Sequence, residues 1–162
     1  MSGDDLHLNA IARQAGVGQG TLYRHFPTRA DLLAEVYRHD VDELVTLAPA
    51  LLAEYNQAPD TALALWFDRV AEYARVKRGV LAAVEGSVWT DLSAHSLGPI
   101  GEAITLLLDA GVAAGVIRDG VDAQDVMTLI AFLTRLDETD WDRRAHLLLA
   151  VVSDGLRPPA SR

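Results

Sequence analysis

A short run near the start of the chain, Gly16–Leu33, gathers side chains that hydrogen bond well to nucleic acid. Glutamine and threonine can read the edges of bases, tyrosine and histidine can bond phosphates, and arginine can do either. Glycine lets a backbone approach a groove closely, although it weakens a helix by roughly 1 kcal/mol relative to alanine. The candidate DNA-contacting residues are Gln19, Gly20, Thr21, Tyr23, Arg24, His25 and Arg29.

The charge of this run is opposite in sign to that of the whole chain. The 162 residues carry a formal net charge of −9, whereas the stretch from Leu6 to Ala30 holds three arginines and no acidic residue. A DNA phosphate responds to the local charge and not to the total. The opening stretch is therefore the segment suited to DNA, and the acidic remainder argues against general polyanion binding.

The elements that must position these side chains are two short helices joined by a tight turn. Leu8–Ala15 has helical apolar spacing, Gly16 supplies a positive φ that closes a helix, and Gly18 or Gln19 opens the next one. This spacing predicts a helix-turn-helix. Its expected inward-facing side chains are Leu8, Ile11, Ala12 and Ala15 from the first helix, and Val17, Leu22 and Phe26 from the turn and the second.

The rest of the chain is predicted to be helical. Thr28-Arg29-Ala30-Asp31 resembles a capping box that starts a third helix at once, which places Arg29 near a DNA backbone. Five further apolar stripes have helical spacing, and strand alternation is absent. We expect helix breaks or kinks at Pro49, Lys77–Gly79 and Leu97–Pro99, and final helices over 122–136 and 141–156.

Several apolar side chains of the middle helices are candidates for lining a ligand cavity. Each of them taken singly is more often a core residue, and together they suggest an apolar pocket for a small molecule. The candidate pocket residues are Trp66, Phe67, Val70, Tyr73, Trp89, Leu92, Leu107 and Leu108.

Other chemistries find little support. Asp91, His95 and Ser96 are the residue types of an acyl-transfer triad, but no nucleophile elbow surrounds the serine. His39 and Glu43 at i, i+4 supply too few ligands for a metal site. We expect that the protein is not an enzyme and that it has no catalytic site, no metal site and no cofactor. The absence of cysteine, of a signal peptide and of an apolar run of about 20 residues favours a cytoplasmic protein without a membrane partner.

The opening stretch resembles the DNA-binding signature of the tetracycline-repressor (TetR) family of transcriptional regulators. The residues that carry the resemblance are Ile11-Ala12, Ala15-Gly16-Val17, Gly20-Thr21-Leu22-Tyr23, His25-Phe26, Arg29 and Leu32-Leu33. The loop and helix pattern of the remainder is most similar to the branch that includes SbtR-like regulators. Family members have one more helix before this motif, so we expect further residues to precede Met1.

The resemblance implies an all-α protein with a helix-turn-helix DNA-binding domain at residues 1–38, incomplete at its N-terminus, and a helical ligand-binding and dimerisation domain at residues 39–162. It implies a homodimer that binds double-stranded DNA at a near-palindromic operator and represses until a small apolar effector releases it. The alternative is a ligand-sensing or protein-binding helical dimer that no longer binds DNA. The expected dimer-interface residues are Val126, Ile130, Leu133, Ala145, Leu148, Leu149 and Val152.

Overall fold

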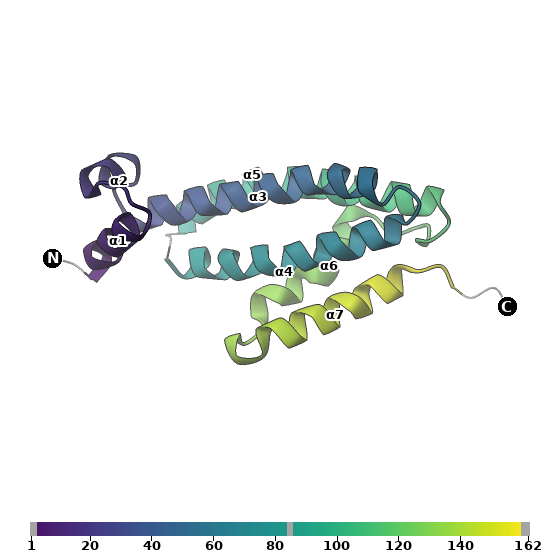
Figure 1. Cartoon of the computed structure of the whole chain (residues 1–162). Helices are drawn as coiled ribbons and strands as arrows, with labels where there is room; N and C mark the ends of the chain where they lie inside the picture. Colours follow the sequence, from purple (N-terminus) through teal and green to yellow (C-terminus); the bar gives the residue numbers. More distant parts are fainter. Residues whose placement is uncertain (1–2, 84–85, 160–162) are drawn as a thin grey trace.

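The part of the chain that the structure describes folds into seven α-helices, arranged as Figure 1 shows. The computed structural model describes residues 3–83 and 86–159, with the side chains of 3–7, 79–83, 86–95 and 138 outside that description. No strand occurs in these residues, so the all-α expectation is confirmed. The elements are α1 (Gly3–Gln14), α2 (Gln19–His25), α3 (Arg29–Glu54), α4 (Pro59–Ala83), α5 (Gly86–Ala113), α6 (Ala123–Ile130) and α7 (Trp141–Leu156), with short 3-10 helices η1 (Ala131–Arg135) and η2 (Glu138–Asp140).

The main core lies between the long helices α3, α4 and α5. Leu44, Trp66 and Ile104, one from each helix, are fully buried there. The indole Nε1 of Trp66 donates a hydrogen bond to the Leu44 carbonyl oxygen at 2.9 Å, which satisfies the one polar atom of that ring. Helix α7 lies along α4, α6 packs against α5, and α1 and α2 sit at the N-terminal end of α3, at the left of Figure 1.

The start of α3 is the capping box that the sequence predicts. The Thr28 hydroxyl oxygen accepts a hydrogen bond from the Asp31 backbone N–H at 3.2 Å, and the Asp31 carboxylate accepts one from the Thr28 N–H at 2.9 Å. These bonds satisfy two backbone donors that a helix start leaves without partners. The prediction is confirmed, and α3 begins directly after the helix-turn-helix.

The expected breaks at Lys77–Gly79 and Leu97–Pro99 are wrong, and Pro49 does not break its helix. Pro49 lies inside α3, Lys77–Gly79 inside α4, and Leu97–Pro99 inside α5. Both prolines are exposed, so a carbonyl that loses its helical partner can be hydrated. The neighbours Ala48 and Ile100 are buried in the core, and this packing holds each helix together across its proline.

The last two predicted helices have different outcomes. Helix α7 has the predicted bounds, whereas the stretch expected over 122–136 divides into α6 and the 3-10 helix η1. Asp122 caps α6 through a second capping box with Asp125. A glycine in the left-handed region follows the end of α5: Gly115 has φ 70°, and the Val116 N–H bonds back to the Gly111 carbonyl at 3.0 Å.

One segment of α5, Ser96–Ala113, is long and apolar enough by length and composition to cross a membrane, with a mean hydropathy of 1.2. Its inner face carries Ile104 and Leu107, which are fully buried against the neighbouring helices. A core helix of a folded domain passes the same test of length and composition. We therefore assign this segment to the core.

Candidate nucleic-acid interface and cavity

The turn between α1 and α2 is closed by a glycine in the left-handed region. Gly16 has φ 69°, its N–H donates to the Arg13 carbonyl at 3.3 Å, and the Val17 N–H donates to the Ala12 carbonyl at 3.0 Å. This pair of bonds is a Schellman motif, which a residue with a Cβ would strain. Gly18 is then the N-cap of α2 and Gln19 its first residue, at the position where the sequence predicts the start of this helix.

A small core of its own holds the two helices together. Leu8, Ala12 and Leu22 are buried, and the partly buried side chains packed against them are Tyr23, Phe26 and Leu32. Leu32 belongs to α3, so this core joins the helix-turn-helix to the long helix. The expectation that Ile11 and Val17 face inward is wrong: their side chains are 40% and 42% exposed. Ala15 is exposed as well.

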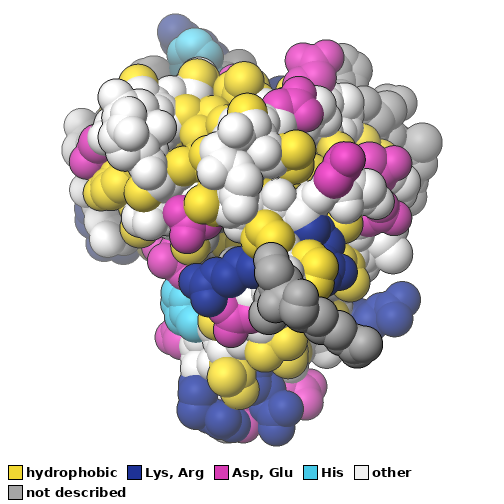
Figure 2. All heavy atoms as spheres, turned by 90° about the vertical axis from the view of Figure 1, so that its right-hand side faces the viewer, with side chains coloured by type: hydrophobic (Ala, Val, Ile, Leu, Met, Phe, Trp, Pro, Cys, Tyr) yellow, Lys and Arg dark blue, Asp and Glu magenta, His cyan; other side chains and the backbone are white. Residues whose placement is uncertain are grey.

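The outer side of α2 presents most of the predicted DNA-contacting residues. Tyr23 is half-buried against the small core, and the exposed members of the set are Gln19, Gly20, Thr21, Arg24, His25 and Arg29. A Cβ added at Gly20 would meet no atom of the described chain within 4 Å, so internal packing does not require glycine there. The end of the molecule opposite the helix-turn-helix carries both acidic and basic side chains among hydrophobic and uncharged ones (Figure 2).

A cavity of about 530 Å³ lies between α4, α5, α6 and η1. Four α4 residues at helical spacing form one wall, and apolar side chains from the other elements form most of the rest. The described lining residues are Val70, Tyr73, Ala74, Lys77, Leu97, Ile100, Gln124, Met127, Thr128, Ile130, Ala131, Leu133 and Thr134.

Only part of the sequence-predicted pocket lines this cavity. Val70 and Tyr73 do. The main core takes up Trp66, Phe67, Leu107 and Leu108, all at most 3% exposed. The predicted side chains of Trp89 and Leu92, like those of Asp91 and His95, lie outside the described residues. The sequence reasoning missed Lys77 and Met127; the signal for Lys77 was its position seven residues after Val70, on the same helical face.

A chain of hydroxyl groups connects the cavity wall to α3. Tyr73 donates a hydrogen bond to the Tyr37 hydroxyl at 2.8 Å, and Tyr37 shares a second one with Ser96 Oγ at 2.7 Å. The two tyrosine rings lie 5.6 Å apart. Burial, more than any other cause, raises the pKa of Tyr73 well above its ordinary value, so its hydroxyl stays protonated at physiological pH.

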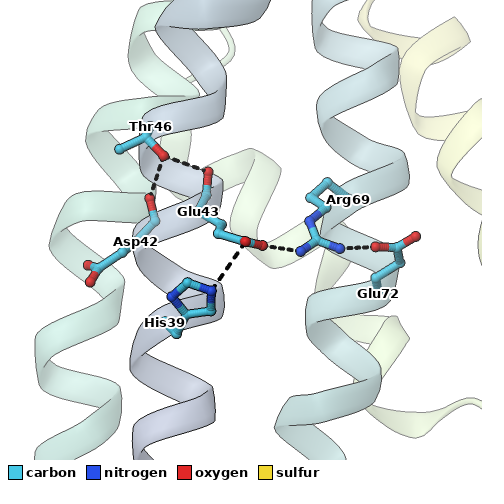
Figure 3. Close-up of polar contacts among 6 residues, drawn as sticks. All are labelled: His39, Asp42, Glu43, Thr46, Arg69 and Glu72. Atoms are coloured by element: carbon cyan, nitrogen blue, oxygen red, sulfur yellow. Dashed lines mark hydrogen bonds and ion pairs between the residues drawn. The ribbon is translucent and has the colours of Figure 1, made fainter.

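A network of exposed ion pairs joins α3 to α4 on the surface (Figure 3). The carboxylate of Glu43 pairs with His39 at 3.3 Å and with Arg69, which also pairs with Glu72. The hydrogen bond from Arg69 lowers the pKa of Glu43 below its ordinary value. No group of three metal-ligating side chains occurs among the described residues.

The predicted dimer-interface residues divide into two groups. Four of them, Val126, Leu133, Ala145 and Leu149, are buried in the chain's own core, and Ile130, Leu148 and Val152 are half-buried. The large apolar side chains that α6 and α7 leave exposed are Leu129, Leu147 and Val151, at 50%, 55% and 58%.

A tight two-helix turn on its own small core, with a polar and cationic second helix facing outward, defines the helix-turn-helix class of DNA-binding proteins. Residues 4–36 match the model for bacterial regulatory proteins of the tetR family, and residues 58–158 match the C-terminal domain of SbtR-like transcriptional regulators. The chain belongs to the TetR family of transcriptional regulators, in its SbtR-like branch. Members of this family are DNA-binding transcription factors and not enzymes.

Two solved structures resemble the chain over nearly its whole length. The first, a TetR transcriptional regulator from Streptomyces coelicolor, is 40% identical with a TM-score of 0.80, covering 93% of this chain and 86% of that one. The second, a TetR transcription regulatory protein from Mycobacterium vanbaalenii, is 30% identical with a TM-score of 0.69, covering 93% and 83%.

Among curated proteins, an HTH-type transcriptional regulator of Staphylococcus aureus strain USA300 is 36% identical over 53 residues. The match spans 33% of this chain and 29% of that regulator.

Proposed function

We propose that the protein is a homodimeric repressor that binds a near-palindromic DNA operator and leaves it when a small molecule enters the cavity. The helix-turn-helix supports the DNA part: its exposed α2 side chains and Arg29 combine base-reading and phosphate-bonding groups. This activity belongs in the cytoplasm, where DNA is accessible. In this proposal residues 1–38 bind DNA, and residues 39–162 bind the ligand and form the dimer. Helix α3 runs unbroken across the boundary between the two domains.

The ligand response rests on one observation, the hydrogen bond from Tyr73 to Tyr37. Tyr73 lines the cavity, and Tyr37 belongs to the helix whose first turn packs on the helix-turn-helix. A ligand that prefers one position of Tyr73 therefore favours one position of α3. A ligand shifts the population of two conformations only if it binds one of them more tightly than the other. A ligand that prefers the conformation in which the two α2 helices of a dimer do not match the spacing of the operator therefore releases the DNA.

The homodimer rests on the apolar side chains that the fold leaves exposed. Leu147 and Val151 are one turn apart on α7, and Leu129 lies on the adjacent α6. Two copies related by a two-fold axis would bury these side chains in a four-helix bundle. To read the two halves of such an operator, the two α2 helices of the dimer would have to lie one DNA turn, roughly 34–36 Å, apart.

The experiment is a fluorescence-anisotropy titration of the full-length protein with DNA from upstream of its own gene, paired with light scattering. We expect saturable binding by a species of dimer mass, with competition by the same fragment at least about tenfold better than by scrambled DNA. Equal competition by both DNAs, or binding by the monomer, contradicts the proposal. The DNA-free alternative predicts no binding even at low salt.

A further inference from the structure

The hydroxyl groups on the described cavity wall use their hydrogens inside the protein. Thr128 and Thr134 each donate a hydrogen bond to a backbone carbonyl oxygen three or four residues earlier, at 2.8 Å and 2.9 Å. Tyr73 donates to the Tyr37 hydroxyl. A threonine hydroxyl has one hydrogen and two lone pairs, so a threonine that already donates meets a ligand as an acceptor.

Thr134 is the acceptor that can contribute most to ligand binding. It is half-buried on η1, which packs against α4, whereas Thr128 is exposed on α6. Among the described residues, none donates a hydrogen bond to the Thr134 hydroxyl oxygen. Water competes less for a partly desolvated oxygen than for an exposed one, so a hydrogen bond from a ligand gains more at Thr134 than at Thr128.

The surroundings of this acceptor are mainly apolar. Val70 and Leu133 are buried in the wall, and Met127 and Ile130 are half-buried there. A carbonyl or ether oxygen placed at Thr134 would face a second acceptor and lose its own hydrogen bond to water, which costs free energy. A ligand hydroxyl at the same place donates its hydrogen to the threonine oxygen.

We propose that the cavity takes an apolar molecule with one hydroxyl group, an alcohol or a phenol, which donates a hydrogen bond to Thr134 while the apolar body lies against Val70, Ile130 and Leu133. The volume of about 530 Å³ suits a ligand of ordinary small-molecule size. This assignment deepens the proposed function and rests on it, because it takes the cavity to be the effector site.

The test uses the full-length protein without DNA and two pairs of isomeric probes. Octan-1-ol is compared with 1-methoxyheptane, and 4-propylphenol with 1-ethyl-4-methoxybenzene, by isothermal titration calorimetry. The members of each pair have the same atoms and both offer an oxygen to the donors of the cavity, but only the first has an O–H. We expect the better-fitting hydroxyl compound to bind at least about threefold more tightly than its ether isomer.

Two variants locate the effect at Thr134. Thr134→Val keeps the shape of the side chain and removes the hydroxyl, so we expect the hydroxyl compound and its ether isomer to bind about equally. Thr134→Ser restores the hydroxyl, and with it the preference for the hydroxyl compound. This rescue separates recognition of the ligand from a loss of packing.

Two control variants remove the same kind of intrahelical hydrogen bond elsewhere. Thr128→Val acts on the exposed threonine of the same cavity, and Thr105→Val acts on an α5 threonine that donates to the Gly101 carbonyl oxygen at 3.0 Å and does not line the cavity. Both should keep the preference for the hydroxyl compound. A preference lost equally in all three valine variants would contradict the role of Thr134.

The wild-type protein alone can overturn the assigned ligand class. Ether isomers that bind as tightly as the hydroxyl compounds in both pairs, no binding of any probe, or a preference that survives Thr134→Val each contradict it. If the hydroxyl compounds bind as expected and DNA affinity does not change, the ligand class stands and the proposed release mechanism fails.

Discussion

The hydroxyl of Tyr73 lies 2.8 Å from the hydroxyl of Tyr37 and donates a hydrogen bond to it, so a residue of the cavity wall is bonded to the helix that carries the DNA-binding motif. Both side chains are buried, at 8% and 1% exposure. A bond of this kind between buried partners cannot be replaced by water without opening the core.

Tyr73→Phe should weaken the communication between ligand and DNA. The variant keeps the ring in the cavity wall and removes the bond to Tyr37, which is worth about 1 kcal/mol, so the ligand's effect on DNA affinity should fall about fivefold. Anisotropy titrations measure this with and without a small molecule that thermal-shift screening has shown to bind the protein. Tyr55→Phe, at the far end of α3, is the control. An unchanged ligand effect in Tyr73→Phe would contradict the coupling role.

Arg29→Ala and Gln19→Ala should separate affinity from specificity. Loss of a phosphate contact at Arg29 should weaken binding to all sequences about equally and reduce the salt slope by about 1. Loss of a base contact at Gln19 should change the order of preference among operator variants. Arg38→Ala, which removes an exposed arginine paired with Glu35, serves as the control. A changed sequence preference with an unchanged salt slope in Arg29→Ala would show that the assigned roles are wrong.

Leu147→Asp should convert the proposed homodimer to monomers. Its side chain is 55% exposed in the single chain, so aspartate there costs the monomer little and places like charges together across a two-fold interface. Light scattering measures the mass. Leu106→Asp, at an exposed position of α5, is the matched control and should remain dimeric. A dimer that survives Leu147→Asp at micromolar concentration locates the interface elsewhere.

Asp40→Asn should stabilise the protein at neutral pH. Burial raises the pKa of the Asp40 carboxyl above its ordinary value of 3.8, against an opposing effect from Arg69. Between the unfolded and the folded pKa the folded state therefore binds more protons than the unfolded state, so the protein loses stability as pH rises from 3.8 through the folded pKa. The neutral amide avoids this loss, and the melting temperature should rise by roughly 1–4 °C. The gain should shrink as pH approaches 3.8. A gain that is independent of pH would assign the effect to something other than ionisation.

The helix-turn-helix could be predicted because its signals are local. Gly16 and the Thr28 capping box specify the turn and the next helix within a few residues. Pro49 and Pro99 gave wrong expectations because proline is also a local signal. Its tendency to end a helix is overcome when tertiary packing buries the flanking residues. Ile11 and Val17 were expected inside from their apolar character, but no described segment covers them.

The cavity could not be predicted from periodicity. Its walls join Tyr73 of α4 to Met127 and Thr128 of α6, and apolar spacing alone does not say which helix faces which. Trp66 and Phe67 have the same pattern as the true lining residues, yet the core takes them up. In the sequence, the feature that distinguishes the lining face of α4 from the core face is Lys77, the single cation in that apolar stripe.

The unbroken length of α3 converts small angles into distances that matter to DNA. Its 26 residues extend roughly 39 Å at about 1.5 Å per residue. A rotation of about 5° around its C-terminal end displaces the attached α2 by about 3 Å, close to the spacing of roughly 3.4 Å between stacked base pairs. If a ligand in the cavity turned α3 by this angle, as the proposed release requires, the reading helix would move out of step with an operator by about one base pair.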